Sequence, residues 1–151
     1  MYLLDAPDGG RLLVTSASDL KLAAECEFGF ARTADVRFGR IEAVDDVLDA
    51  MGERTIVMGN QHEARLIEHY RGQGSLIEIE RPGRGVSGLR AAQSATLDAL
   101  HARTDMVVQA TFFDPDHGPD VAPGLGLAFV GYADFLEHRG DGVYRVLDSK
   151  L

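Results

Sequence analysis

Alternation of apolar and polar residues is clearest in the last quarter of the chain. Two runs rich in β-branched and aromatic residues, 131–136 and 144–150, flank the polar, glycine-containing segment 138–142. This pattern predicts a β-hairpin whose turn centres near Gly140. A shorter apolar run at 12–14 predicts another strand near the start of the chain.

The remaining segments change between helical spacing and continuous apolar runs. Further elements are expected along the chain, namely helices over 18–31, 41–50, 60–70 and 88–103, strands over 76–80 and 106–113, and a proline- and glycine-rich loop over 114–126. Strands and helices in this order predict an α/β (α+β) protein, with a mixed β-sheet flanked by helices.

Composition narrows the class of protein. The 151 residues are 45% hydrophobic and 26% charged, which predicts a single domain over 1–151 with a real core. Apolar runs all fall short of the roughly 20 residues that cross a membrane, and the N-terminus lacks the pattern of a signal peptide. We therefore expect a cytoplasmic protein with no membrane partner. The formal net charge of −9 argues against a basic nucleic-acid platform.

Carboxylates interrupt both predicted hairpin strands. If the turn centres at Gly140, Asp134 faces Val146 and Asp148 faces Tyr132. Because side chains alternate along a strand, Asp134, Asp148 and Lys150 then share one face of the sheet. The two aspartates would be diagonal neighbours about 7–8 Å apart at the backbone, close enough to converge on one divalent cation. An ordinary ion pair between Asp134 and Lys150, with Asp148 solvated, explains the same spacing.

A third ligand for such a site lies on the predicted helix 60–70. Glu63 and His62 follow Gly59, and either side chain could complete a site with the hairpin aspartates. A solvated helix face is the alternative explanation for both residues. Oxygen-rich ligation favours Mg²⁺ or Mn²⁺ over Zn²⁺.

Several motifs together resemble a known family. A helix-borne Glu63 or His62, then Gly-Tyr-Ala-Asp ending at Asp134, then Asp-Ser-Lys over 148–150 resembles the PD-(D/E)xK nuclease superfamily, and within it the RecB-like nucleases found beside or fused to helicases. The opening Thr-Ser-Ala-Ser-Asp-Leu over 15–20 followed by Cys26, and the run Val-Gln-Ala-Thr-Phe-Phe over 108–113, are similar to that group too. The resemblance spans nearly the whole chain.

The resemblance implies a restriction-endonuclease-like core and a role for each residue. Asp134 would be the central metal ligand, and Asp148 the second acidic ligand. Lys150 would position or activate the attacking water. Glu63 falls where the family places its helix-borne ligand, with His62 as second choice. The implied activity is Mg²⁺- or Mn²⁺-dependent hydrolysis of DNA in repair, recombination or defence.

Two departures from the family qualify these expectations. Some relatives hold an iron–sulfur cluster through four cysteines, but this chain has only Cys26, for which we expect no cluster and a small buried side chain on the helix 18–31. The chain ends one residue after Lys150, whereas the family continues with a further helix. We therefore expect the N-terminal piece of a larger protein, with a core incomplete at its C-terminus. An open sheet edge would favour homo-oligomers.

The early end of the sequence also leaves a second functional reading open. In one reading the parent protein is an active nuclease, coupled to a fused or associated helicase. In the other, the chain is a catalytically inactive or truncated nuclease fold that acts as a binding or scaffolding module. A third reading treats the hairpin aspartates as structural residues of an acidic α/β domain.

Overall fold

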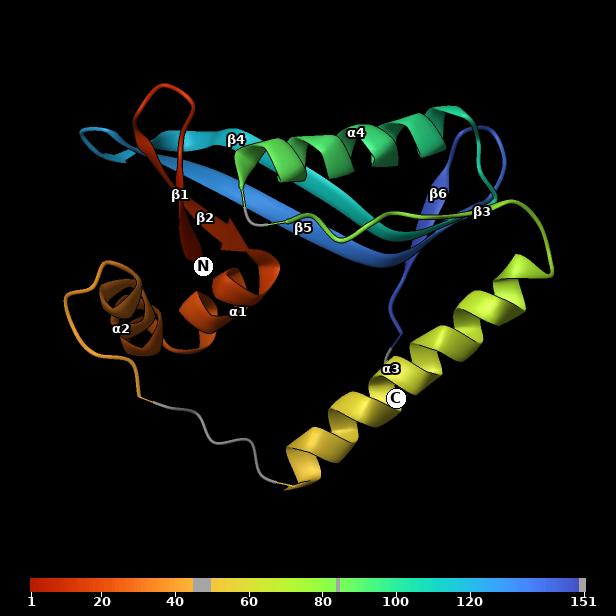
Figure 1. The fold of residues 1–151 in the computed structure, drawn as a ribbon, viewed down its shortest axis with the longest axis horizontal. Helices are drawn as coiled ribbons and strands as arrows, with labels where there is room; N and C mark the ends of the chain where they lie inside the picture. The colour runs from red at the N-terminus through yellow and green to blue at the C-terminus, as the bar shows by residue number, and fades with distance from the viewer. Residues whose placement is uncertain (45–49, 84, 150–151) are drawn as a thin grey trace. The chain divides into compact units, whose positions relative to one another are not determined.

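A computed structural model describes residues 1–44, 50–83 and 85–149 of the chain. The described residues form a mixed α/β structure (Figure 1), which confirms the predicted class. The elements are β1 (Tyr2–Asp5), β2 (Arg11–Ser16), α1 (Ala17–Glu25), α2 (Glu27–Arg37), α3 (Ala50–Arg71), β3 (Leu76–Glu78), α4 (Val86–His101), β4 (Met106–Ala122), β5 (Leu125–His138) and β6 (Tyr144–Leu147). The strand order is β1-β2-β5-β4-β3, and β6 also pairs with β5. Within the described ranges, no helix is both long and apolar enough to cross a membrane.

The residues group into two compact units. Unit 1 comprises Met1–Val44, Pro82–Ala91 and Phe112–Gly131, and unit 2 comprises Asp45–Arg81, Ala92–Thr111 and Tyr132–Leu151. Helix α4 and strands β4 and β5 contribute residues to both units. Each unit has an apolar core of its own.

Unit 1 is organised around strand β2. This strand pairs antiparallel with β1 and parallel with the first part of β5, from Arg11 opposite Leu125 to Ser16 opposite Val130. The predicted strand at 12–14 is therefore present, whereas β1 was not expected. Buried residues of the two strands pack with the start of α4 and with β4 in one cluster, which contains Val14, Val86, Leu89, Phe113, Ala128 and Val130.

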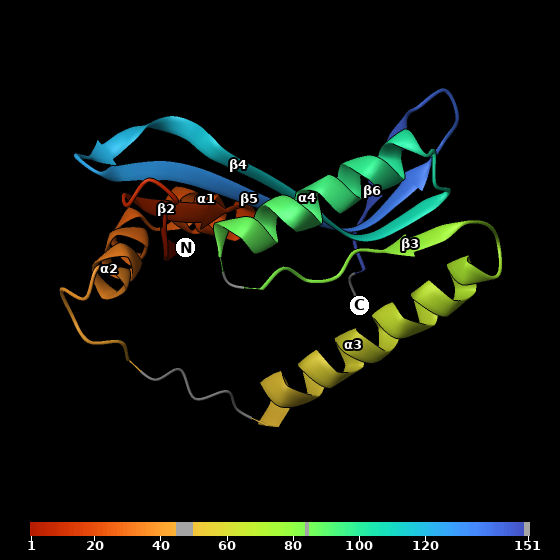
Figure 2. The same ribbon diagram turned by 45° about the horizontal axis from the view of Figure 1, so that its top comes forward.

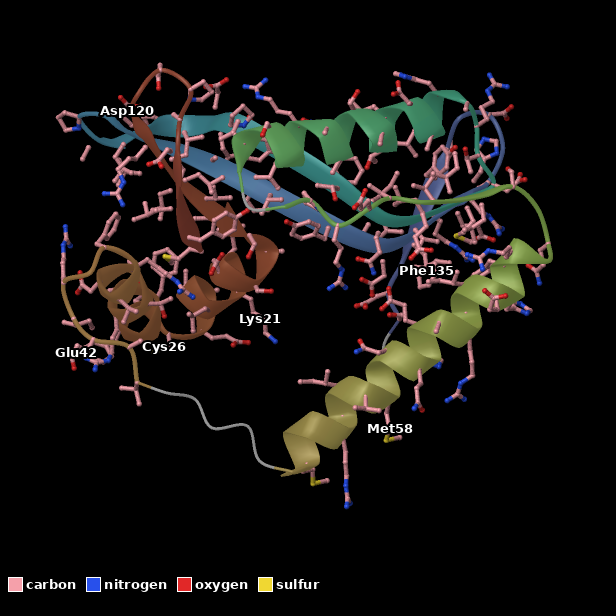
Figure 3. All side chains as sticks on the ribbon, in the orientation of Figure 1. Lys21, Cys26, Glu42, Met58, Asp120 and Phe135 are labelled. Atoms are coloured by element: carbon pink, nitrogen blue, oxygen red, sulfur yellow. The ribbon has the colours of Figure 1, made fainter. Side chains whose placement is uncertain are left out.

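The helix expected over 18–31 is interrupted at Cys26. The Cys26 backbone is extended, with φ −155° and ψ 94°, so α1 ends there and α2 begins. Its side chain is exposed (Figure 3), and its sulfur accepts a hydrogen bond from the Gly29 N–H at 3.2 Å. The prediction of a buried Cys26 inside one helix was wrong, because the residue caps the second helix from outside the core.

Unit 2 has helices on both faces of its strands. Val107 belongs to a cluster with Ala92 and Ala99 of α4, whereas Val108, the next residue, packs with Leu66 and Ile67 of α3. Because consecutive strand residues point to opposite faces, α4 covers one face and α3 the other. Phe135 of β5 (Figure 3) is buried on the α3 face, and its ring centroid lies 5.8 Å from that of Tyr70.

Helix α3 is longer than the sequence pattern predicted. It begins at Ala50 rather than at residue 60, and Gly59 lies inside it. Of the predicted helix over 41–50, residues 41–44 are not helical and residues 45–49 lie outside the described part of the chain. Helix α4 and strand β3 fall close to their predicted positions.

The expected loop over 114–126 is instead the outer half of a long hairpin. Strands β4 and β5 continue to a two-residue turn, Pro123-Gly124, where Gly124 has φ +72° as a type II turn requires. Strand β3 pairs with β4 only at Met106–Val108. Pro115 and Pro119 lie beyond this paired stretch of β4. They are therefore tolerated, since a proline has no N–H to donate to a neighbouring strand.

Candidate functional site

The predicted hairpin is present, with its register shifted by two residues. Phe135 pairs with Leu147 and His138 with Tyr144, so the turn centres near Asp141 rather than Gly140. A shift of two residues leaves the side chains of the paired positions 135–138 and 144–147 on their predicted faces. Asp134 and Asp148 lie one step beyond the last recorded pair, so their shared face stays a prediction.

Asp134 is half-buried on β5 and is held from one side by Ser149. Its Oδ2 atom accepts hydrogen bonds from the Ser149 backbone N–H and from the Ser149 hydroxyl, both at 3.0 Å. Asp148 is exposed. Figures 1 and 2 both show the segment after β6 leaving the sheet toward α3. Lys150 lies outside the described residues, so its predicted position on this face stays a prediction.

Glu63 reaches the sheet from helix α3. Its carboxylate accepts a hydrogen bond from the side-chain amide of Gln109 on β4, and both residues are half-buried. His62, one residue earlier, points about 100° away around the helix. Of the two helix-borne candidates, Glu63 is therefore the one with a recorded bond to the strands.

A groove of about 630 Å³ opens beside this contact. It lies within unit 2 and is lined by Asn60, Glu63, Ala64, Ile67, Glu78, Ile79, Glu80, Arg81 and Gln109. Three glutamates and one arginine make its wall acidic. Neither Asp134 nor Asp148 belongs to the lining, so Glu63 and Gln109 are the groove residues that lead toward the hairpin.

Gln109 and Asp134 face each other across the two central strands. The His138 N–H donates to the Asp105 carbonyl at 2.9 Å, which pairs the end of β5 with the start of β4. Counting four residues along both strands from this bond brings Gln109 opposite Asp134. Glu63 and Asp134 are far apart in the sequence. In unit 2, however, Gln109 lies between them, because it contacts Glu63 on one side and its strand neighbours that of Asp134 on the other.

Gln109 was not a predicted site residue. It is the one amide in the apolar run 106–113, and this interruption was the only sequence signal that singled it out. Its backbone has φ +57°, which is uncommon for a residue other than glycine and unexpected within a strand.

The other acidic residue of strand β5, Glu137, is already ion-paired. Glu137 lies 2.6 Å from Arg145 and 3.2 Å from Arg139. Burial alone would raise the pKa of Glu137, but hydrogen bonds and charge from the two arginines outweigh it and lower the pKa. Glu137 thus forms an ordinary ion-pair network, and its carboxylate is not a candidate ligand.

The candidate residues offer oxygen donors, which fit Mg²⁺ or Mn²⁺ better than Zn²⁺. Within the described ranges, no three His, Cys, Asp or Glu side chains are arranged to hold a metal ion. The carboxylate of Glu63 is engaged by Gln109, and that of Asp134 by Ser149. Binding a cation would therefore require these side chains to share their carboxylates with it.

Known proteins provide no template for this site, since no family model matches the chain and no curated protein or solved structure matches it. Any function must therefore be argued from the side chains themselves. These are the carboxylates of Glu63, Asp134 and Asp148, with the amide of Gln109 between helix and hairpin.

Proposed function

We propose that this protein hydrolyses phosphodiester bonds in DNA with Mg²⁺ or Mn²⁺, as a RecB-like nuclease of the PD-(D/E)xK superfamily with a restriction-endonuclease-like core. The observation that carries the proposal is the pair of hydrogen bonds from Ser149 to Asp134, which bring the neighbouring Asp148 to the part of β5 that carries Asp134. Lys150 follows Asp148 by two residues in the sequence, at the spacing of the Asp-Ser-Lys motif.

Each side chain has a role in the proposed reaction. Asp134 and Asp148 bind the cation, and Glu63 adds a third carboxylate from α3. A bound Mg²⁺ or Mn²⁺ supplies a water of lowered pKa and offsets charge on the phosphate. Lys150 orients the attacking water and stabilises negative charge that develops on the phosphate oxygens.

Ser149 supports the central ligand. Both of its hydrogen bonds go to Oδ2 of Asp134, so they fix the plane of the carboxylate from one side. The other oxygen, Oδ1, is the atom through which we expect Asp134 to bind the cation. An outer partner of this kind is typical of metal sites, since it orients the ligand before the metal arrives.

The charge of the chain limits how DNA can be held. With a net charge of −9 and a groove that carries three glutamates, affinity for a polyanion must come from the metal ions and from a few arginines such as Arg81. We propose that a fused or associated helicase supplies additional DNA contacts, and that the protein acts in the cytoplasm in DNA repair, recombination or defence.

A binding or scaffolding module is the second candidate function. It is favoured by the hydrogen bonds that already occupy the Glu63 and Asp134 carboxylates, and by the lack of a three-ligand group among residues 1–44, 50–83 and 85–149. In that case the same hairpin would be a relic of a nuclease fold, and a self-associating sheet edge would be a natural interface.

Calorimetry with Mn²⁺ and a DNA cleavage assay separate the two candidates. The wild type should bind Mn²⁺ and cut DNA, Asp134→Ala should lose both, and Lys150→Ala should bind Mn²⁺ without cutting. Asp98→Ala, which removes an exposed carboxylate from α4, is the matched control and should behave as the wild type. A wild type that neither binds Mn²⁺ nor cuts DNA would favour the scaffold. Cleavage by Asp134→Ala at the wild-type rate would show that the site is elsewhere.

A further inference from the structure

Strand β4 breaks its alternation at Gln109. Val107 belongs to the cluster with α4 and Val108 to the cluster with α3, so regular alternation would put Gln109 on the α4 face and Ala110 on the α3 face. Ala110 instead packs in the α4 cluster. The positive φ of Gln109 is the local cause, because a residue in the left-handed region does not continue the regular alternation of an extended strand.

The break in alternation turns a polar side chain away from an apolar core. On the α4 face, the amide of Gln109 would be buried with Val107 and Ala99 and would lose its hydrogen bonds to water. In the observed conformation it donates to Glu63 of α3. The unusual backbone and the hydrogen bond are therefore connected, because the positive φ directs the amide of Gln109 to the carboxylate of Glu63.

Strand β5 has a matching break at Asp134. Ala133 and Leu136 both pack in the α4 cluster, although they are three residues apart, and Phe135 lies on the α3 face. The irregularity falls on Asp134, which the strand register sets opposite Gln109. The breaks in these neighbouring strands thus fall on two polar residues, Gln109 and Asp134.

We propose that Gln109 is a positioning residue, whose side-chain amide orients the Glu63 carboxylate toward the part of the sheet that carries Asp134. The significance of this orientation for metal binding rests on the proposed function, whereas the contact itself does not. A neutral amide suits the task, because it directs one carboxylate oxygen and leaves the negative charge that attracts a cation. An arginine or lysine in its place would neutralise that charge.

Two substitutions separate positioning from structural support. Gln109→Gly removes the amide and accepts the positive φ without a steric cost. Gln109→Asn keeps an amide and also tolerates the left-handed conformation, but it is one methylene too short to keep the bond to Glu63. Gln73→Ala, which removes an exposed amide outside the groove lining, is the control.

The first measurement needs no metal. In NMR spectra the side-chain NH₂ signals of Gln109 should shift in Glu63→Ala and stay unchanged in Glu68→Ala, which removes an exposed carboxylate from the same helix. The second is Mn²⁺ calorimetry together with thermal unfolding. Gln109→Gly and Gln109→Asn should bind Mn²⁺ roughly tenfold more weakly, as expected for loss of an outer partner of a ligand. The unfolding midpoint of Gln109→Gly should equal or exceed that of the wild type.

Each outcome decides the inference. If the Gln109 side-chain signals are unchanged in Glu63→Ala, the inference is overturned, regardless of the measured Mn²⁺ affinity. The inference is also overturned if the signals shift but Gln109→Gly and Gln109→Asn bind Mn²⁺ with wild-type affinity. The contact would then have no effect on how Glu63 binds the cation. Weaker Mn²⁺ binding with a parallel loss of stability in Gln109→Gly would make the residue structural. If the wild type binds no Mn²⁺, the proposed function fails, and the NMR result alone decides whether Gln109 orients Glu63.

Discussion

Two aspartate–serine pairs in unit 2 use the same chemistry in different surroundings. Asp105 Oδ2 accepts from the Ser75 N–H at 2.9 Å and from the Ser75 hydroxyl at 2.8 Å. Asp134 Oδ2 accepts the same two kinds of bond from Ser149, both at 3.0 Å. The sequence distinguishes neither pair, because 30 residues separate Asp105 from Ser75 and 15 separate Asp134 from Ser149.

The first pair joins the residues just before β3 and β4 by hydrogen bonds in both directions, and we call this contact between Ser75 and Asp105 the joint. Asp105 returns a bond from its own N–H to the Ser75 hydroxyl at 2.9 Å, and the Met106 N–H donates to the Ser75 carbonyl at 3.0 Å. A Cβ atom at Gly74 would lie 2.7 Å from Asp105 Oδ2, so the joint has no room to open. The Ser75 N–H, followed by its hydroxyl, holds the pKa of Asp105 below the usual 3.8.

The second pair joins a strand to the segment beyond the last recorded strand pairing. Ser149 follows β6 and, like Ser75, donates both of its bonds to one carboxylate oxygen, but among the described residues no return bond from the Asp134 N–H to the Ser149 hydroxyl is recorded. The comparison teaches that reciprocity, rather than the presence of a hydrogen bond, distinguishes a structural carboxylate from one that can accept a ligand. Asp105 closes the start of β3 and β4, whereas Asp134 is oriented and remains a candidate ligand.

Exchanging each aspartate for asparagine should give the largest contrast. Asp134→Asn should weaken Mn²⁺ binding by more than the roughly 10–100-fold that loss of an outer partner costs, with little change in melting temperature. Asp105→Asn should lower the melting temperature by a few degrees and keep Mn²⁺ affinity, because its carboxylate only closes the joint. Calorimetry and thermal unfolding of both variants measure the contrast. Equal loss of stability in the two would remove the distinction between the pairs.

A smaller effect is expected from crowding the joint. Gly74→Ala would push against Asp105 and displace its bonds to Ser75, so we expect a loss of about 1–3 kcal/mol in the free energy of unfolding. Gly72→Ala is the matched control, since its Cβ would meet only the His69 carbonyl at an ordinary 3.6 Å. Urea unfolding measures both. A control variant as unstable as Gly74→Ala would mean that the joint is not the cause.

The smallest expected effect is a dependence on pH of the stability that Asp105 contributes. Because folding lowers the pKa of Asp105, the unfolded chain binds its proton more readily, and the stabilisation present above pH 3.8 is lost as the pH falls through the folded value. The advantage of the wild type over Asp105→Asn in unfolding midpoint should therefore shrink below pH 3.8. Midpoints measured across this range test it, and an advantage independent of pH would contradict the assigned cause.

Part of the fold followed directly from local pattern. The hairpin strands, α4 and β3 lie close to their predicted residues, since their alternation or helical spacing is regular. The outer half of the β4–β5 hairpin was missed because its prolines and glycines are typical of loops. Helix α3 was predicted too short because Gly59 was taken to precede it, although packing of Leu66 and Ile67 stabilises the helix as a whole.

The candidate site was predictable to a similar extent. The hairpin register was wrong by two residues, and the shared face of Asp134 and Asp148 stays a prediction, because Asp148 follows the last recorded strand pair. Asp134, Asp148 and Glu63 could be selected from residue type and order. The roles of Ser149 and Gln109 could not, because both depend on bonds between segments far apart in the chain.

The sequence by itself determined where apolar and polar side chains alternate, and therefore which elements form. Tertiary structure alone decided that Gln109 turns from the α4 face to Glu63, that Asp105 exchanges hydrogen bonds with Ser75 in both directions, and that Cys26 caps a helix outside the core. The physical reason is that alternation is a property of neighbouring residues. A positive φ within a strand, by contrast, costs free energy that only the surrounding packing and hydrogen bonds can offset.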